Sequence, residues 1–337
     1  MDALGRALLS LDGLSVGDAV GERFFGPAPD VMQRISRREL PDAPWTYTDD
    51  TEMALSIVEI LKELGGIDQD LLAARFAHRM QAHRNYGQGA CAVLCGVKAG
   101  HDWRLLTQIG FRGMGSFGNG AAMRVAPLGA FFADQPLEVV RKAARLSAEV
   151  THAHAEGIAG AVAVAAAAAL AWQTRGRREL GRTWITAVRD AVPPGYTRDA
   201  VAETLGVHPD ATILEAAQKL GNGSGVTAPD TVPLCLWVIA HASRGFEDAL
   251  WHGECTWRPR HHLCHRRRPA DLRQFPDAGC NRARHCRPGP SSPGPHIPDR
   301  KGPHARIVPV GSPDEGFAIA HACRIHCLPD VAAFTSG

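Results

Sequence analysis

The chain has 337 residues, of which 45% are hydrophobic, 21% charged and 6% aromatic. This apolar fraction excludes an intrinsically disordered chain, and the lack of a glycine periodicity excludes a fibre. The formal net charge of +2 averages two unlike segments, because residues 1–251 hold 24 Lys and Arg against 28 Asp and Glu, whereas residues 252–337 hold 13 against 7. Most of the nine cysteines also follow residue 252. The composition therefore predicts a slightly acidic body and a basic tail.

The N-terminal segment lacks the features of a secretory signal peptide, since an acid follows Met1 and no cleavage site follows an apolar core. The longest apolar run, residues 158–172, is mostly alanine. It is shorter and less hydrophobic than the run of about 20 residues that spans a membrane. We therefore expect a buried helix there and a soluble, cytoplasmic protein. Thiols are reduced in that compartment, so no disulfide framework is expected.

Apolar residues recur at helical spacing through the body of the chain. The pattern predicts helices over residues 53–64, 71–80, 137–150 and 158–172, the first ended by Gly65 and Gly66. Asp230 resembles an N-cap with Pro233 in the first turn, which predicts a helix through Trp237 and His241. Alternating strand patterns are scarce. The predicted fold class is all-α, with a largely irregular tail.

An acidic segment stands at the start of the first of these helices. Thr48, Asp49 and Asp50 offer one hydroxyl and two carboxylates within one turn. Oxygen ligands of this kind suit Mg²⁺, Mn²⁺ or Ca²⁺. The alternative is an N-terminal cap, in which Asp49 and Glu52 form a capping-box-like pair. The motif alone leaves both interpretations open.

A glycine-rich segment, residues 115–124, could bring backbone N–H groups close to a phosphate and open a helix behind it. It matches neither the Rossmann nor the Walker spacing, so a plain turn is the default interpretation. A second glycine-rich segment, residues 221–225, gives no local sign of a ligand. His152 and His154 form a pair of a kind that is more often structural than catalytic.

In this order, the motifs resemble one family, the ADP-ribosylglycohydrolases, over about residues 5–251. The resemblance rests on Gly17-Asp18-Ala19-Val20-Gly21, Thr48-Asp49-Asp50-Thr51-Glu52-Met53, Tyr86-Gly87-Gln88-Gly89, the loop at residues 118–127, Thr151-His152 and Asp230-Thr231-Val232-Pro233. The ordered set is far more specific than any one of its members. It favours the metal interpretation of the acidic segment over the cap.

The resemblance implies a compact all-α fold with a binuclear Mg²⁺ or Mn²⁺ site, and hydrolysis of the glycosidic bond between ADP-ribose and a protein side chain or small acceptor. It implies Thr48, Asp49 and Asp50 as metal ligands, with the two aspartates also catalytic. It implies substrate contacts at Gly87, Gly118, Asn119, Gly120 and His152. The expected partner is an ADP-ribosylated protein or small ADP-ribose conjugate; nucleic acid and membrane are not expected, and the chain is expected to be a monomer.

Two departures from the family pattern stand out. Many members carry a glutamate seven residues after the aspartate of the Gly-Asp pair, where this chain has Phe25; the nearest acid, Glu22, is the candidate acid or base. Members also have a late Gly-Asp-x-Asp-Thr/Ser motif, expected shortly after Trp251, and the sequence has none downstream. A non-catalytic ADP-ribose-binding protein is therefore the alternative function.

The tail, residues 252–337, is predicted not to fold natively, because it has many prolines and arginines and no helical or strand pattern. Back-translated and read one nucleotide later, residues 257–268 permit Gly-Asp-Arg-Asp-Thr-Thr-Cys-Ala-Ile-Val-Gly-Gly, which contains the missing motif. Our hypothesis is a reading-frame slip between about Trp251 and Trp257. The alternative is a zinc or nucleic-acid site, for which the tail lacks paired-ligand spacing and has few aromatic residues; its candidate ligands are Cys255, His261, His262, Cys264, His265, Cys280, His285 and Cys286.

Overall fold

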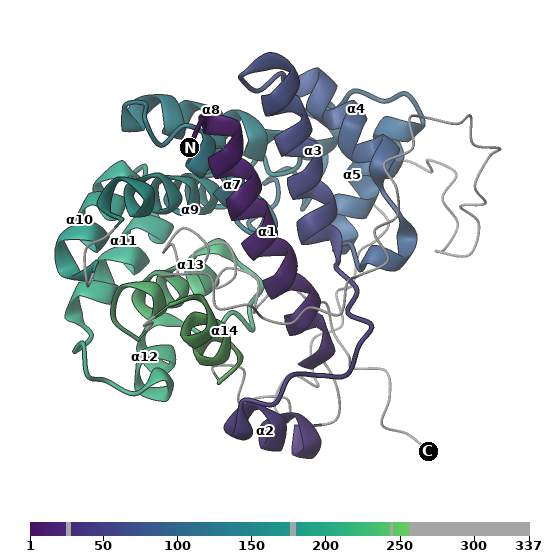
Figure 1. The fold of residues 1–337 in the computed structure, drawn as a ribbon. Helices are drawn as coiled ribbons and strands as arrows, with labels where there is room; N and C mark the ends of the chain where they lie inside the picture. Colours follow the sequence, from purple (N-terminus) through teal and green to yellow (C-terminus); the bar gives the residue numbers. More distant parts are fainter. Residues whose placement is uncertain (25–27, 176–179, 243–244, 256–337) are drawn as a thin grey trace.

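The structure is a computed structural model that describes residues 1–24, 28–175, 180–242 and 245–255 (Figure 1). Phe25 and the tail from residue 256 onward lie outside the described residues. This part of the tail includes the sequence that follows the proposed frame slip and most of the candidate zinc ligands. Within them the chain forms helices and no strand, so the all-α prediction is confirmed. The α-helices are α1 Ala3–Gly21, α2 Ala28–Arg37, α3 Asp49–Leu64, α4 Gln69–Arg79, α5 Gln88–Lys98, α6 Trp103–Ile109, α7 Ala126–Phe131, α8 Leu137–Glu149, α9 Ala155–Thr174, α10 Gly181–Ala191, α11 Tyr196–Glu203, α12 Ile213–Leu220, α13 Ala228–Trp237 and α14 Phe246–Cys255.

The helices predicted from periodicity are present with small shifts of their ends. α3 ends at Leu64 because Gly65 adopts a left-handed conformation (φ 66°) and its N–H bonds back to the Leu61 carbonyl. α4 and α8 match the predicted stripes over residues 71–80 and 137–150. Their apolar faces pack into one large core that joins α1, α3, α4, α7, α8 and α9.

The alanine-rich helix α9 is the centre of this core and contacts α7, α8, α10 and α13. Small side chains let neighbouring backbones approach closely: a Cβ at Gly129 of α7 would lie 2.2 Å from the carbonyl oxygen of Ala165. Among the described helices, α9 alone has the length and hydropathy of a membrane span, and 78% of its apolar window is buried inside the protein. The prediction of a buried helix at residues 158–172 is confirmed.

The start of α13 differs from the prediction. The helix begins at Ala228 with Thr227 in the N-cap position, so the predicted cap at Asp230 is wrong and Pro233 lies inside the helix. Asp230 instead holds the second glycine-rich segment, because its Oδ2 accepts a hydrogen bond from the Gly225 N–H (2.7 Å). Beyond Trp237 the chain continues as a π-helix over Val238–Ala242, which carries it past His241 as predicted.

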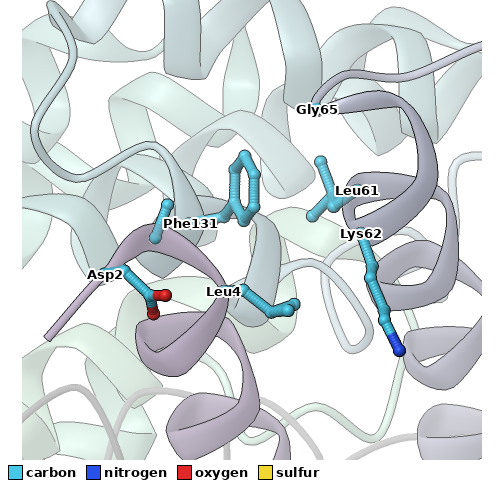
Figure 2. A pocket seen from close by; sticks show the side chains of 7 residues that line it. Asp2, Leu4, Leu61, Lys62, Gly65 and Phe131 are labelled. Atoms are coloured by element: carbon cyan, nitrogen blue, oxygen red, sulfur yellow. The ribbon is translucent and has the colours of Figure 1, made fainter.

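α1 and α3 run antiparallel, so each end of the pair joins the C-terminus of one helix to the N-terminus of the other (Figure 1). At the N-terminal end of α1 a shallow hollow of about 320 Å³ lies between Leu4, Leu61 and Phe131, with Lys62 at its edge (Figure 2). At 1.5 Å per helical residue, Leu61 is roughly 18 Å along α3 from Asp49. The hollow is therefore remote from the acidic segment, which lies at the opposite end of the pair.

Candidate functional site

The N-terminus of α3 is capped by a carboxylate from α1. Asp18 is fully buried and accepts hydrogen bonds from the backbone N–H groups of Thr48 (2.9 Å) and Thr51 (3.1 Å) and from both hydroxyls (3.0 and 2.6 Å). Thr48 occupies the N-cap position without a side-chain cap bond, and Asp49 is the first helical residue. The capping-box interpretation of Asp49 and Glu52 is therefore wrong, since Asp18 performs the capping.

Asp49 and Asp50 are buried carboxylates beyond what the cap requires. Their exposed fractions are 5% and 1%. Burial raises the pKa of Asp49 to about 8, because desolvation disfavours the charged form, while the Arg124 guanidinium acts in the opposite direction. A bound divalent cation would reverse this preference and hold both groups ionised. Carboxylates buried at this cost are typical of a site rather than of a helix end.

The donor chemistry of this turn fits a hard divalent cation in part. Thr48 Oγ1 donates to Asp18 Oδ1 (3.0 Å) and also lies beside the Asp49 carboxylate, whose pKa its hydrogen bond lowers. With Asp49 and Asp50 this makes three oxygen donors from one turn, the ligand type that Mg²⁺ prefers. The part of the chain that the structure describes contains no group of three His, Cys, Asp or Glu side chains arranged to hold a metal. The turn by itself therefore supplies a partial ligand set.

Glu22 lies beside the acidic turn, in the short 3₁₀ helix η1 (Glu22–Phe24) that follows α1. Its Oε1 accepts a hydrogen bond from Asn85 Nδ2 (2.7 Å). Burial raises the pKa of Glu22 above its ordinary value, and the charge of Glu22 in turn raises the pKa of Asp49. A raised pKa suits a carboxyl group that exchanges protons near neutral pH. The acid or base role of Glu22 stays a prediction.

A second ionic cluster lies behind the acidic turn. Glu52, which is 1% exposed, pairs with Arg79 (3.7 Å) and with Arg84 (3.4 Å). Arg84 also donates to the Tyr47 carbonyl oxygen (2.7 Å), and its guanidinium carbon lies 3.6 Å from the centre of the Tyr47 ring. These contacts hold the residue immediately before Thr48 in place. The cluster therefore fixes the approach of the chain to the acidic turn.

The first glycine-rich loop is fixed by the chain segment that precedes α13. Gly118 forms an antiparallel bridge with Thr227, and the Asn119 N–H donates to the Val226 carbonyl oxygen (3.1 Å). The Asn119 side chain is 2% exposed and donates through Nδ2 to Thr231 Oγ1 (2.9 Å). Asn119 thus ties the loop to α13, and its predicted contact with substrate stays a prediction.

The segment directly behind this loop forms turns, which agrees with the default interpretation, and the helix that it could have opened is absent. Residues 120–124 form turns, and α7 begins only at Ala126 with Val125 in the cap position. The N–H groups of Ala122 (2.8 Å) and Met123 (3.2 Å) both donate to the Asn119 carbonyl oxygen, which closes these turns. Any phosphate bound here would therefore meet the glycine backbone and side chains around it, and not a helix dipole.

His152 packs against the glycine loop. A Cβ at Gly118 would lie 3.5 Å from His152 Nε2, one at Gly120 would lie 3.2 Å from Cε1, and one at Gly157 would lie 3.2 Å from Cδ2. The glycines thus leave the space that the imidazole ring occupies. The ring is 5% exposed, and burial together with the Arg124 charge lowers the pKa of His152 to about 3. His152 is neutral at physiological pH.

Arg124 links the acidic turn to the histidine. It is 1% exposed and its Nη2 donates to Thr151 Oγ1 (2.8 Å), next to His152. The Asp49 and Asp50 charges raise its pKa, but desolvation is larger and lowers it to about 9. The guanidinium therefore feels both carboxylates while bonding toward the glycine loop. The structure brings the two groups of predicted residues to one region through this side chain.

Gly87 lies at the edge of the same region, in the N-cap position of α5. A Cβ at Gly87 would meet no atom within 4 Å, so steric crowding does not explain this glycine. The preceding Tyr86 is buried, and desolvation with the charges of Glu52 and Asp49 raises its pKa. Tyr86 thus places Gly87 next to the acidic turn, and the substrate contact of Gly87 stays a prediction.

Comparison with known proteins decides the family. A model of the family described as ADP-ribosylglycohydrolase matches residues 1–253. The chain belongs to this family. It is 40% identical over 190 residues to human ADP-ribosylhydrolase ARH3, covering 51% of each chain, and 30% identical over 269 residues to the zebrafish (Danio rerio) ARH3, covering 71% of each. The alignments to the human and chicken (Gallus gallus) proteins thus span about half of those relatives.

The fold agrees with that of a solved relative. A structure of an ADP-ribosylglycohydrolase-related protein complex superposes with a TM-score of 0.51 at 22% identity, covering 76% of this chain and 82% of the other. Every predicted site residue falls inside the family match. The sequence did not single out Asp18, Arg124 or Thr151 as site residues, although all three stand inside or beside the family motifs. Their roles depend on contacts between helices, which the motifs do not report.

Proposed function

We propose that this member of the ADP-ribosylglycohydrolase family is a cytoplasmic, divalent-metal-dependent hydrolase that cleaves the glycosidic bond between ADP-ribose and a protein side chain or small acceptor. The observation that carries the proposal is the pair of buried carboxylates, Asp49 and Asp50, left over after Asp18 has capped α3. The relatives named ADP-ribosylhydrolase ARH3 support the choice of substrate class.

In this proposal Thr48, Asp49 and Asp50 hold a Mg²⁺ or Mn²⁺ ion, the first half of a two-metal site. When bound, such a cation polarises oxygen atoms of water or of a ribose hydroxyl. Asp18 fixes the three ligands by anchoring the first turn of α3. Arg124 offsets part of the negative charge and helps to keep Asp49 ionised.

Proton transfer and substrate binding fall to the surrounding residues. Glu22, held by Asn85, is the candidate to take a proton from the attacking water or return one to the departing acceptor. The backbone of Gly118 and Gly120 and the ring of His152 form the candidate binding surface for the ADP-ribose diphosphate, with Gly87 at its edge.

The second candidate function is ADP-ribose binding without catalysis. It is favoured by the sequence after Trp251, which lacks the late Gly-Asp-x-Asp-Thr/Ser motif that the family uses to complete its metal site. The acidic turn is then a partial ligand set, while the glycine loop and His152 remain complete. Binding and turnover separate the two candidates.

The test is release of ADP-ribose from an ADP-ribosylated peptide with Mg²⁺ or Mn²⁺ and with EDTA, beside calorimetric titration of free ADP-ribose. Asp49→Asn and Asp50→Asn are expected to lower turnover by about 100-fold or more, because each removes a ligand charge. Glu63→Gln on the exposed end of α3 is the control and should leave turnover unchanged. Tight binding without turnover in the wild-type chain would favour the second candidate, and indifference to both aspartate changes would overturn the metal assignment.

A further inference from the structure

The hydrogen bonds of Arg124 lead to the histidine beside the glycine loop. Nη2 of this buried side chain donates to the Ser147 carbonyl oxygen (3.0 Å) and to Thr151 Oγ1 (2.8 Å). The guanidinium carbon also lies 4.7 Å from the centre of the Phe76 ring, which fixes the plane of the group. An arginine has donors and no acceptor. Thr151 must therefore accept in its bond with Arg124.

The position of the Thr151 hydroxyl hydrogen follows from this bond. Within the described residues, Thr151 Oγ1 meets two polar groups, Arg124 Nη2 and His152 Nδ1 (2.7 Å). Because the arginine can only donate, the hydroxyl hydrogen points to Nδ1, which accepts. A neutral imidazole that accepts at Nδ1 carries its proton on Nε2. The lowered pKa of His152 agrees with a neutral ring.

The protonated nitrogen faces the glycine loop. His152 Nε2 lies 3.3 Å from the position of a Cβ on Gly120 and 3.5 Å from that of a Cβ on Gly118. Neither glycine has a side chain, so the Nε2–H group lies against the bare backbone of the loop. A donor in this place suits a diphosphate oxygen, which only accepts, whereas a bare Nε2 lone pair would repel it.

We propose that Arg124 and Thr151 are positioning residues that fix His152 as the Nε2–H tautomer, so that its ring donates to an oxygen of ADP-ribose held at the Gly118–Gly120 loop. The identity of the ligand rests on the proposed function; the tautomer does not. Arg124 orients Thr151, and Thr151 orients His152. Neither positioning residue needs to touch the ligand.

The tautomer is measured directly in the ligand-free full chain by ¹⁵N NMR with selectively labelled histidine. His152→Gln identifies the His152 signals by their disappearance. We expect a bare Nδ1 and a protonated Nε2 in the wild-type chain near neutral pH. A protonated Nδ1, in a neutral or a charged ring, would overturn the proposal whether or not the chain binds ADP-ribose.

Substitutions of Thr151 test the positioning. Thr151→Val keeps the shape but removes the hydroxyl, and we expect mixed tautomers and about tenfold weaker ADP-ribose binding by calorimetry. Thr151→Ser restores the hydroxyl and should restore both readings. Thr204→Val, which removes a buried hydroxyl in the 3₁₀ helix Thr204–Gly206, is the matched control for the loss of a buried hydrogen bond and should change neither.

Two outcomes of the Thr151 substitutions also contradict the proposal, and one further outcome contradicts only the function. A single Nε2–H tautomer retained in Thr151→Val would show that the threonine does not set it. Weaker binding in both Thr151→Val and Thr151→Ser would show that the hydroxyl is not the cause. If the wild-type chain fails to bind ADP-ribose, the proposed function falls, and the NMR comparison of the three chains still decides whether Thr151 sets the tautomer.

Discussion

Two helix N-termini in the described chain are capped by a buried carboxylate from a neighbouring helix. Asp18 of α1 caps α3, and Glu156 of α9 caps α11 by accepting hydrogen bonds from the N–H groups of Tyr196 (2.9 Å) and Thr197 (2.6 Å). Both carboxylates are nearly inaccessible, at 0% and 6% exposed. Each supplies charge-assisted bonds to a helix N-terminus, where negative charge is favourable.

The two ends differ in the acids that remain after capping. The first turn of α3 also buries Asp49, Asp50 and Glu52, whereas the acid in the first turn of α11, Asp199, is exposed. Glu52 meets two arginines. One capping carboxylate satisfies the free N–H groups at each of these two helix N-termini, and further buried carboxylates carry a desolvation cost. The excess at Asp49 and Asp50 therefore separates a candidate site from a structural cap.

The largest effect on activity is expected from restoring the late metal-binding motif that would act together with Asp49 and Asp50. If the frame slip is real, a one-nucleotide correction near codon 252 encodes the late Gly-Asp-x-Asp-Thr motif and supplies further carboxylates for the cation. We expect ADP-ribose release to rise by at least about 100-fold over the uncorrected chain, because a two-metal site needs ligands from both motifs. Sequencing of the gene across codons 245–260 and assay of the corrected chain are the measurements.

The matched control is the corrected chain with Asp49→Asn, which should lose the gain. An early stop codon in the corrected frame, or a corrected C-terminus without helical periodicity, would contradict the slip. In that case the surplus carboxylates of α3 would have no partner from this part of the gene.

Substitution of the two caps tests the comparison itself. Asp18→Asn and Glu156→Gln each remove a charged acceptor and are expected to lower the free energy of unfolding by about 2 kcal/mol. Asp18→Asn should also lower turnover by about tenfold or more, or weaken Mg²⁺ binding if turnover is undetectable, because it loosens the turn that carries Asp49. Glu156→Gln should leave both within twofold.

Urea unfolding and metal-dependent turnover measure the two effects. Equal losses of function in Asp18→Asn and Glu156→Gln would show that the cap at α3 has no special role in the candidate site. Loss of stability in one variant alone would show that the two carboxylates do not cap in the same way.

Much of the fold follows from the sequence because its signals are local. The periodic apolar stripe of α3 and its glycine stop depend on neighbouring residues, and both appear as predicted. The predicted start of α13 was wrong because Asp230 looks like a local N-cap in the sequence. In the structure its carboxylate instead binds the N–H of Gly225 in the second glycine-rich segment. The capping of α3 by Asp18 was missed for a similar reason. Asp18 and Thr48 are 30 residues apart in sequence, and only the packing of α1 on α3 brings them together.

The candidate site was predictable as a set of residues but not as an arrangement. The family motifs contain Thr48, Asp49, Asp50, Gly118 and His152, and the structure gathers them in one region. Motifs do not report that a buried arginine connects the acidic turn to the histidine, since Arg124 follows a glycine loop and its partners come from α8 and the segment after it. Such roles appear only when helices distant in sequence are packed together.

A pair of glycines sharpens the distinction between cap and site. Gly195 precedes α11 with φ 152°, and a Cβ there would lie 2.4 Å from Glu156 Oε1, so Gly195→Ala is expected to cost about 2 kcal/mol of unfolding free energy. Gly87→Ala meets no atom within 4 Å at φ −59° and should cost less than about 0.5 kcal/mol. We expect weaker ADP-ribose binding in Gly87→Ala alone. Destabilisation by Gly87→Ala, or unchanged affinity, would assign this glycine to the structural class.

The smallest expected effect is on the pH dependence of stability and concerns the residues around the start of α9. There His152 belongs to the candidate site, whereas Glu156, four residues later, is a structural cap. The pKa of His152 is lowered to about 3 by burial, far below that of an exposed histidine, so the unfolded chain binds a proton that the folded chain excludes. Stability should therefore fall as the pH drops below about 6.5. The wild-type chain is expected to lose roughly 1 kcal/mol more than His152→Gln between pH 6.5 and 5.5. Urea unfolding at both pH values measures the difference, with substitution of the exposed His101, His101→Gln, as control. If His152→Gln lost stability with pH as steeply as the wild-type chain, the ring of His152 would be protonated in the folded chain. That result would exclude a neutral donor beside the glycine loop.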